Sequence, residues 1–324
     1  MKKIFMRIFA FIILVNIIYL LGPRPSLDQD YRFNPQNIPL DIENYLKTSE
    51  HQYDDIVKGA EKEIIWANED KQKTEIALIY IHGFSATRAE IEPVTSNVAK
   101  ALNANIFFTR LKGHGRPGEE MGNVQMVDWL NDTAEAIEIG KRIGERVILI
   151  STSTGSALST WAASHPKLSE DIDGLVLISA NYAIHAAPTW QLTMPWGQQV
   201  IEMVAGKERG RNCNLSQAER LIDAKWTACY PTKALTTMGA IMRTVTDIDK
   251  STIKTPALFI YSTEDKVVKP KAIEKVISDW GGEKQIYKLS DTSNNDNHVI
   301  TGDYGAPETT ADITQTIIKW INNQ

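Results

Sequence analysis

Cysteine is scarce in this sequence: two of the 324 residues are cysteines, Cys213 and Cys229. They form no Cys-x-x-Cys pair and have no histidine at ligand spacing, so we expect no metal site. In an oxidising compartment the two thiols could form a disulfide that closes a short loop, and buried free thiols are the alternative. We favour the disulfide, on condition that the domain is exported.

A basic cluster is also missing. The chain has 35 Lys and Arg against 40 Asp and Glu, a formal net charge of −5, and its positive residues are spread along the chain. Binding of nucleic acid needs clustered positive charge, so no nucleic-acid partner is expected. The length suits one large α/β domain that carries an insertion.

The first 25 residues depart from this globular pattern. Basic residues at the start precede an almost unbroken apolar stretch from Ile8 to Leu21, and Pro23 and Pro25 then end any helix. Because no Ala-x-Ala cleavage site precedes Gly22, residues 1–25 are interpreted as an uncleaved signal anchor rather than a cleaved signal peptide. The positive start predicts a membrane-anchored enzyme outside the cytoplasm, which is the periplasm if the source is a Gram-negative bacterium.

Beyond the anchor, residues 26–62 are interpreted as a linker with a short amphipathic helix, and residues 63–324 as one α/β domain. Short apolar runs predict strands, and stretches of helical periodicity lie between them. The predicted strands are Ile76–Ile81, Asn105–Phe108, Val147–Ile150, Leu175–Ile178, Ala257–Tyr261 and Gln285–Leu289. The predicted helices are Glu90–Leu102, Met126–Ile143, Thr154–Ser164, Lys271–Trp280 and Ala311–Ile321. This alternation predicts a doubly wound, mostly parallel sheet.

One segment, from about residue 182 to 250, interrupts the alternation. It contains no clean strand pattern but several Trp and Met residues, and it is interpreted as a helical insertion on the side where such sheets bind ligands. Ordinary packing of a small cap and a lipid-binding surface are both compatible with these side chains.

The strongest chemical signal lies at Val147–Leu158, which reads VILISTSTGSAL. An apolar strand leads into a turn of small residues and then a helix, which places Ser153 at the tip of the turn, beside a helix N-terminus. The usual motif is Gly-x-Ser-x-Gly, and here Ser151 stands at its first position. Ser151 and Ser156 could compete for the role of nucleophile, but neither has the same place at the strand tip.

Two further strand ends could supply the partners of this serine. Strand Ile76–Ile81 runs into His82-Gly83-Phe84, so the backbone N–H groups of Phe84 and Thr154 are the candidate oxyanion hole, and His82 is expected to hold the turn. Asp265 follows strand Ala257–Tyr261 and is preferred to Glu264 as the residue that orients a histidine. His298 is the only histidine after Asp265, and the order serine, acid, histidine matches this fold.

With these residues in place, the chain resembles the serine carboxylesterase and monoacylglycerol lipase group of the α/β-hydrolases. The matching pieces are His82-Gly83-Phe84, Gly113-His114-Gly115, the turn at Ser153, Asp265-Lys-Val-Val and His298-Val-Ile-Thr301. The resemblance implies an eight-stranded sheet with a helical cap, no metal or organic cofactor, and hydrolysis of short-chain acyl esters or monoglyceride-like lipids.

Ser153, Asp265 and His298 are thus predicted to form a catalytic triad that works through an acyl-enzyme. An aminopeptidase or thioesterase on the same fold is an alternative, because it shares the triad. An inactive, membrane-anchored binding protein is a second alternative. The predicted partners are a small ester or lipid substrate and the membrane; the oligomeric state is left open.

Overall fold

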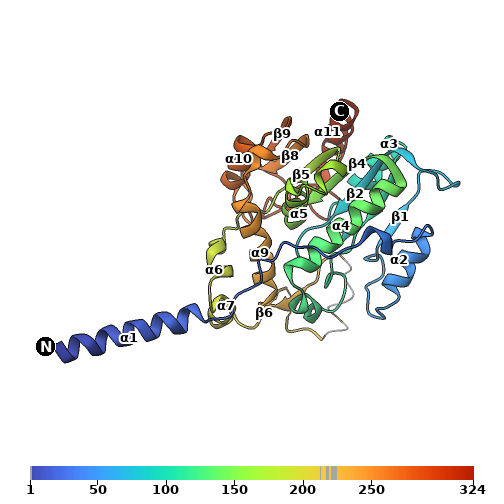
Figure 1. The fold of residues 1–324 in the computed structure, drawn as a ribbon. Helices are drawn as coiled ribbons and strands as arrows, with labels where there is room; N and C mark the ends of the chain where they lie inside the picture. Colours follow the sequence, from blue (N-terminus) through green and yellow to red (C-terminus); the bar gives the residue numbers. More distant parts are fainter. Residues whose placement is uncertain (1, 212, 217–218, 220–224) are drawn as a thin grey trace.

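The computed structural model describes residues 2–211, 213–216, 219 and 225–324, and most of these residues fold around one twisted sheet (Figure 1). The sheet strands are β1 (Glu63–Ile65), β2 (Thr74–Ile81), β3 (Asn105–Phe108), β4 (Gly144–Thr152), β5 (Gly174–Ile178), β8 (Ala257–Ser262) and β9 (Lys284–Leu289). Their order is β1-β3-β2-β4-β5-β8-β9; β1 runs antiparallel to β3, and all other neighbours are parallel.

Helices cover both faces of the sheet, as the alternation of strands and helices predicts. Outside the insertion, the described residues form the helices α1 (Lys2–Leu20), which lies away from the sheet, α2 (Ile42–Glu50), α3 (Val94–Ala101), α4 (Met126–Ile143), α5 (Thr154–Ser164), α10 (Pro270–Asp279) and α11 (Thr310–Asn322). The predicted mostly parallel, doubly wound α/β sheet is therefore confirmed. The sheet has seven strands rather than the eight that the resemblance implies, because the described residues between α1 and β1 form the short helix η1 (Pro35–Asn37), α2 and loops.

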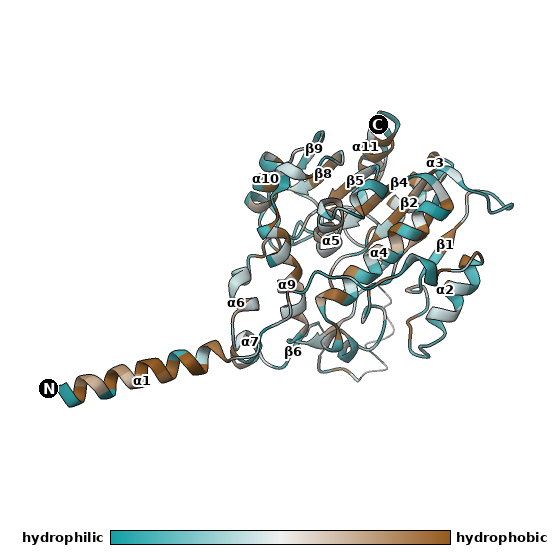
Figure 2. Cartoon of the chain, viewed as in Figure 1, coloured by the Kyte–Doolittle hydropathy of each residue, from teal (hydrophilic) through white to brown (hydrophobic). Residues whose placement is uncertain are grey.

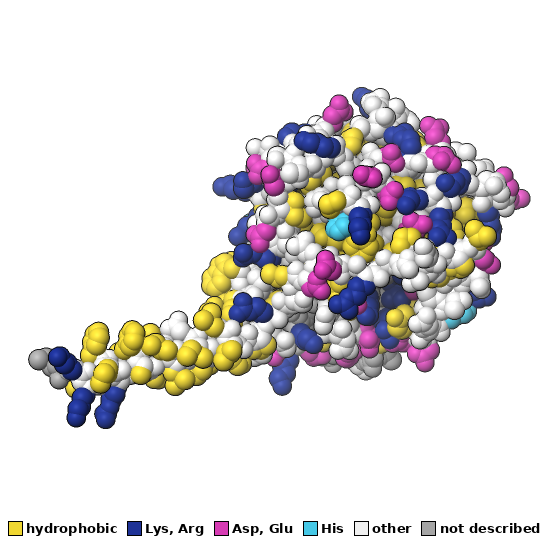
Figure 3. All heavy atoms as spheres, in the orientation of Figure 1, with side chains coloured by type: hydrophobic (Ala, Val, Ile, Leu, Met, Phe, Trp, Pro, Cys, Tyr) yellow, Lys and Arg dark blue, Asp and Glu magenta, His cyan; other side chains and the backbone are white. Residues whose placement is uncertain are grey.

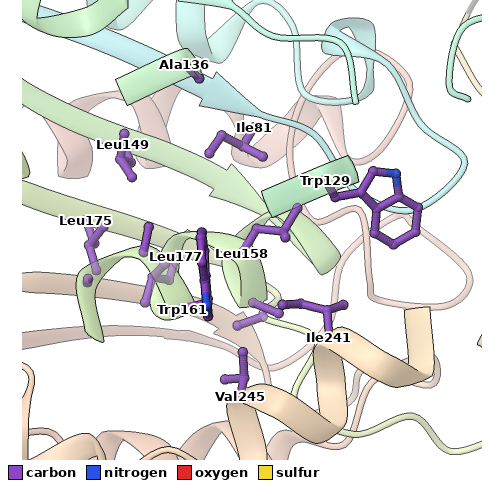
Figure 4. Close-up of a cluster of buried hydrophobic side chains, with 14 of the residues drawn as sticks. Ile81, Trp129, Ala136, Leu149, Leu158, Trp161, Leu175, Leu177, Ile241 and Val245 are labelled. Atoms are coloured by element: carbon purple, nitrogen blue, oxygen red, sulfur yellow. The ribbon is translucent and has the colours of Figure 1, made fainter. Parts of the chain in front are cut away.

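Alternation along the buried strands divides the core into two layers. In β2, Ala77, Ile79 and Ile81 belong to one apolar cluster, whereas the intervening Leu78 and Tyr80 belong to the cluster on the opposite face. Both sets are fully buried. Figure 4 shows part of the first cluster, in which side chains of β4 and β5 meet those of α5 and α9. The burial of apolar side chains on both faces is the main contribution to the stability of such a sheet.

Between β5 and β8 the chain leaves the sheet. This insertion contains α6 (Thr189–Thr193), α7 (Gly197–Ala205), β6 (Glu208–Gly210), β7 (Cys229–Pro231) and α9 (Ala234–Asp247). Strands β6 and β7, which the sequence pattern did not predict, form a small antiparallel sheet, and Cys213 and Cys229 are joined by a disulfide. Helix α9 packs through Ile241 and Val245 onto the main core, so the insertion is fastened to the sheet domain.

The segment 26–62 lies against the sheet domain rather than apart from it. The backbone N–H groups of Arg32 and Phe33 donate to Asn131 of α4 at 2.6 and 2.9 Å. Farther along, Glu50 at the end of α2 forms a bidentate ion pair with the buried Arg110. Residues 26–62, which the sequence suggests as a linker, thus form a strap that is docked on the sheet domain at α4 and Arg110.

Helix α1 projects from the body and touches it only near its C-terminal end, among the residues that the structure describes (Figure 2). It is apolar around its whole circumference, no residue of it is buried, and it has the length and composition of a membrane-spanning helix. Its end is held by Trp196, whose Nε1 donates to the carbonyl oxygen of Ile18 at 3.0 Å and whose backbone N–H donates to that of Pro23 at 2.9 Å.

Candidate active site

Ser153 lies between the last residue of β4 and the first residue of α5, at a sharp backbone turn. Its φ of 52° and ψ of −114° are unfavourable for a residue with a side chain. The turn is fixed by a hydrogen bond from the Ser153 N–H to the carbonyl oxygen of Ile178 at 2.9 Å. A β-carbon at Gly155 would lie 2.1 Å from the carbonyl oxygen of Ile81, so only glycine fits there. The local sequence therefore forms the strand–turn–helix expected to hold a nucleophile at the tip of the turn.

The neighbouring serines have other partners. The Ser151 hydroxyl donates to the carbonyl oxygen of Val176 at 3.3 Å, inside the sheet. The Ser156 hydroxyl donates to the carbonyl oxygen of Ser151 at 2.8 Å. Both side chains are fully buried, which leaves Ser153 as the serine of this turn that faces the histidine.

The structure brings together the three residues that the sequence placed at separate strand ends. His298 Nε2 lies 3.0 Å from Ser153 Oγ, and His298 Nδ1 lies 2.8 Å from Asp265 Oδ2. The other carboxylate oxygen, Asp265 Oδ1, accepts hydrogen bonds from the backbone N–H groups of Val267 and Val268 at 2.8 and 2.9 Å. Those bonds direct Oδ2 toward the imidazole, while Glu264 is exposed to solvent.

A tight loop after β9 presents the histidine. Asn297 adopts a left-handed φ of 50°, which asparagine tolerates better than most residues. Its side chain accepts from the Thr292 N–H at 2.7 Å and donates to Asp291 at 2.8 Å. The carbonyl oxygen of His298 accepts a hydrogen bond from the Ser179 hydroxyl at 2.7 Å. No role was predicted for Asn297 or Ser179; the contact of Ser179 joins segments far apart in the chain, and that of Asn297 depends on the fold of its loop.

The two proposed oxyanion donors come from two different segments of the chain. Thr154 is the first residue of α5, where backbone N–H groups have no partner within the helix. Phe84 follows Gly83 in the loop after β2. Within the part of the chain that the structure describes, neither N–H group has a hydrogen-bond acceptor. Free N–H groups at a helix N-terminus and in a loop beside it suit a developing negative charge.

His82 has the supporting role that its position suggests. Its Nδ1 lies 2.9 Å from the carbonyl oxygen of Gly83, and its Nε2 accepts from the Leu111 N–H at 3.1 Å. Burial lowers the pKa of His82 to about 4, so the ring is neutral and donates through Nδ1 near neutral pH. The His114 ring packs against it in a tilted arrangement, with ring centroids 4.9 Å apart, and is also fully buried.

A buried acid that the sequence analysis did not single out lies behind this loop. Glu90 is 2% exposed and accepts a hydrogen bond from the Gly83 N–H at 2.6 Å. In the sequence it stands at the start of a predicted helix, where an acidic residue usually faces solvent. No local pattern marks it, because its partners come from β2 and the following loop.

Potential metal ligands gather at one place among the described residues, where Glu208 lies beside Cys213 and Cys229. Both sulfur atoms are held in the disulfide, so this group offers no thiolate ligand.

Comparisons with known proteins establish the family and the fold of this chain. A family model described as serine aminopeptidase, S33, matches residues 72–293, which is more than half of the chain and includes Ser153 and Asp265. The chain belongs to this serine aminopeptidase S33 family. His298 lies five residues beyond the matched region, in the order along the chain that an α/β-hydrolase requires.

Relatives of this family member include lipolytic enzymes. A thermostable monoacylglycerol lipase from Bacillus sp. (strain H-257) is 28% identical over 234 residues, which cover 72% of this chain and 86% of the relative. A solved structure from work on the metagenome-derived lipolytic enzymes LipS and LipT superposes with a TM-score of 0.63 at 23% identity, over 83% of this chain and all of that one. The monoacylglycerol lipase of Paleococcus ferrophilus gives a TM-score of 0.59 at 14% identity, over 80% and 96%. These structural likenesses establish the α/β-hydrolase fold.

Proposed function

We propose that this carboxylesterase-type hydrolase cleaves esters through Ser153, with His298 as general base and Asp265 as the residue that orients the imidazole. One observation carries the proposal: a single imidazole lies within hydrogen-bond distance of both the Ser153 hydroxyl and the Asp265 carboxylate. This is the arrangement that makes an alcohol a strong nucleophile.

The steps follow from the positions of the atoms. As Ser153 Oγ attacks the ester carbonyl carbon, its proton moves to His298 Nε2, and the carbonyl oxygen becomes an oxyanion that the Phe84 and Thr154 N–H groups bind. The imidazolium, stabilised by Asp265, then gives the proton to the departing alcohol, and an acyl-enzyme remains. Water, deprotonated by His298, then attacks the acyl-enzyme by the same steps. The acid is released and Ser153 is restored.

Short-chain acyl esters and monoglyceride-like lipids are the proposed substrates. The Bacillus relative is a monoacylglycerol lipase, and its similarity to this chain extends over most of both sequences. The family description instead names an aminopeptidase, so a peptidase that uses the same three residues is the second candidate.

Labelling and a substrate panel test both candidates. A fluorophosphonate probe is expected to label the wild-type chain, and mass spectrometry should place the label on Ser153. Wild-type protein is then assayed on p-nitrophenyl esters of increasing acyl length, on monoacylglycerols and on amino-acid anilides. Turnover of esters with little on anilides supports the esterase; faster turnover of anilides would support the peptidase, and a label on another serine would reject the mechanism.

We also propose that α1 anchors the enzyme in a membrane, with the α/β domain (residues 63–324) and its cap (about 182–250) outside the cytoplasm. The basic residues at the start of α1 favour the cytoplasmic side. Trp196, which precedes α7, bonds to Ile18 near the end of α1, and Met203 and Val204 in the last turn of α7 are 80% and 83% exposed. Figure 3 shows hydrophobic side chains continuing from α1 onto the adjoining body, a surface that suits contact with lipid.

Charge introduced into α1 is expected to release the enzyme from the membrane. An aspartate near the centre of a spanning helix costs about 3 kcal/mol, so Ile12→Asp combined with Leu14→Asp should move the full-length chain from the alkali-washed membrane pellet to the soluble fraction. Met203→Asp is the control and should leave it in the pellet, because α7 would only touch the bilayer surface. Retention of the double variant would show that α1 is not the anchor.

A further inference from the structure

Glu90 is a buried carboxyl that the proposed mechanism does not use. It ends the short helix η2 (Arg88–Glu90), which follows the loop that carries Phe84. Among the residues that the structure describes, no lysine or arginine forms an ion pair with it, although its side chain is nearly inaccessible to water. A buried carboxyl without a cationic partner is costly unless it has a defined set of hydrogen bonds.

Those hydrogen bonds connect the two segments that build the active site. Glu90 Oε1 accepts from the Gly83 N–H at 2.6 Å and from the Tyr80 hydroxyl at 2.7 Å. The Tyr80 hydroxyl also lies 3.1 Å from Thr152 Oγ1, on the residue before Ser153. One carboxylate oxygen thus links the loop after β2 to the end of β4.

The second oxygen of the carboxyl and the nucleophilic residue both lie beside Gly83. A β-carbon at Gly83 would lie 3.1 Å from Glu90 Oε2 and 3.2 Å from Ser153 Cβ. The carboxyl and the nucleophilic residue therefore flank the same side of Gly83. The oxyanion donor, the Phe84 N–H, belongs to the next peptide along the chain, so its direction depends on how Gly83 is held.

We propose that Glu90 is a positioning residue of the active site. Its carboxyl fixes the Gly83 peptide so that the Phe84 N–H points at the oxyanion, and its negative charge, when it is ionised, repels that oxyanion. The proposal rests on the function proposed above, because it requires Ser153 to be the nucleophile.

The protonation state of Glu90 determines whether the rate rises or falls with pH. Burial raises the pKa of Glu90 to about 7, against the opposing effects of the Tyr80 hydroxyl, the Gly83 N–H and His298. The titratable groups that face it are Tyr80 from β2 and His298 from the loop after β9, and Glu92 acts on Tyr80 in turn. Below its pKa Glu90 is neutral; above it, the carboxylate repels the nearby oxyanion and raises the energy of the transition state.

Substitution of Glu90 by glutamine tests this charge effect. For wild type, kcat on a soluble p-nitrophenyl ester is expected to fall about 10-fold as pH rises through the ionisation of Glu90, with KM nearly unchanged, because the oxyanion exists only in the transition state. Glu90→Gln keeps an oxygen for the Gly83 N–H but cannot ionise, so this alkaline decrease should vanish. The acid decrease that a general-base mechanism predicts should remain in both proteins.

Glu92→Gln is the matched control, since Glu92 bonds to Thr95 and Ser96 at the start of α3, away from Gly83. It is expected to keep the wild-type pH profile. Tyr80→Phe removes a group that stabilises the carboxylate, so it should shift the alkaline decrease to higher pH; this variant tests the same charge if Glu90→Gln fails to fold.

The outcomes separate the two proposals. If the wild-type chain hydrolyses esters and is labelled at Ser153, but Glu90→Gln keeps the alkaline decrease or matches Glu92→Gln at every pH, the role of Glu90 is rejected and the proposed function stands. If the wild-type chain shows neither hydrolysis nor labelling of Ser153, both are rejected.

Discussion

Replacement of Ser153 by alanine is expected to lower kcat for ester hydrolysis by at least about 10⁴-fold with little change in KM. The hydroxyl that His298 approaches at 3.0 Å would be lost, while the oxyanion donors and the rest of the site would remain. An alanine side chain needs no more space than serine, so the strained turn should keep its geometry. Steady-state kinetics on a p-nitrophenyl ester, with circular dichroism to check folding, measure the effect.

Ser156→Ala is the matched control for that experiment. Ser156 lies in the first turn of α5, three residues after Ser153, but its hydroxyl donates to backbone carbonyl oxygens. Its loss should cost stability of about 1 kcal/mol and should leave kcat within a few-fold of wild type. If Ser153→Ala retained near wild-type turnover, or if Ser156→Ala abolished it, the nucleophile would have to be sought elsewhere.

Replacement of Glu50 by glutamine is expected to lower the free energy of unfolding by about 3–5 kcal/mol, the largest change in stability that we predict. Glu50 and Arg110 have side chains only 8% and 4% exposed, and they form two hydrogen bonds of 2.8 and 2.7 Å. The neutral amide would leave the Arg110 guanidinium buried without its counter-charge. Urea unfolding followed by tryptophan fluorescence measures the difference.

Glu43→Gln supplies a control within the same helix. Glu43 pairs with Lys71, but both side chains are about half exposed, at 48% and 51%, and such pairs contribute less than about 1 kcal/mol. If Glu50→Gln and Glu43→Gln lowered the free energy of unfolding equally, burial of the Glu50–Arg110 pair would contribute nothing to stability.

Acid should weaken the same contact. Burial alone would raise the pKa of Glu50, but the hydrogen bonds and charge of Arg110 outweigh it and hold the pKa below its usual value. A carboxyl whose pKa is lower in the folded state stabilises the fold above its unfolded pKa of about 4.3, and this contribution disappears as pH falls through the folded value. The difference between wild type and Glu50→Gln should therefore shrink at acid pH.

The docking of the strap that contains Glu50 could not be predicted from the local sequence pattern. Residues 26–62 are mixed in composition and predict a linker with one short helix. They are held in place by Asn131, Arg110 and other residues of the sheet domain. Strands β1, β6 and β7 are three residues each, which is too short for an alternating pattern to stand out.

The sequence by itself determined the main sheet, the turn at Ser153 and the order of the candidate site residues. Helices α4 and α5 and strand β3 have the predicted bounds. In α4 the amphipathic period expresses the burial directly, whereas α5 and β3 are buried throughout and their predicted bounds follow from their small or apolar residues. Only the tertiary structure decided which atoms meet: that His298 joins Ser153 to Asp265, that Glu90 lies behind Gly83, and that Glu50 pairs with Arg110. Each of these contacts joins different elements, and its geometry depends on how loops cross the edge of the sheet, which no local pattern of residues encodes.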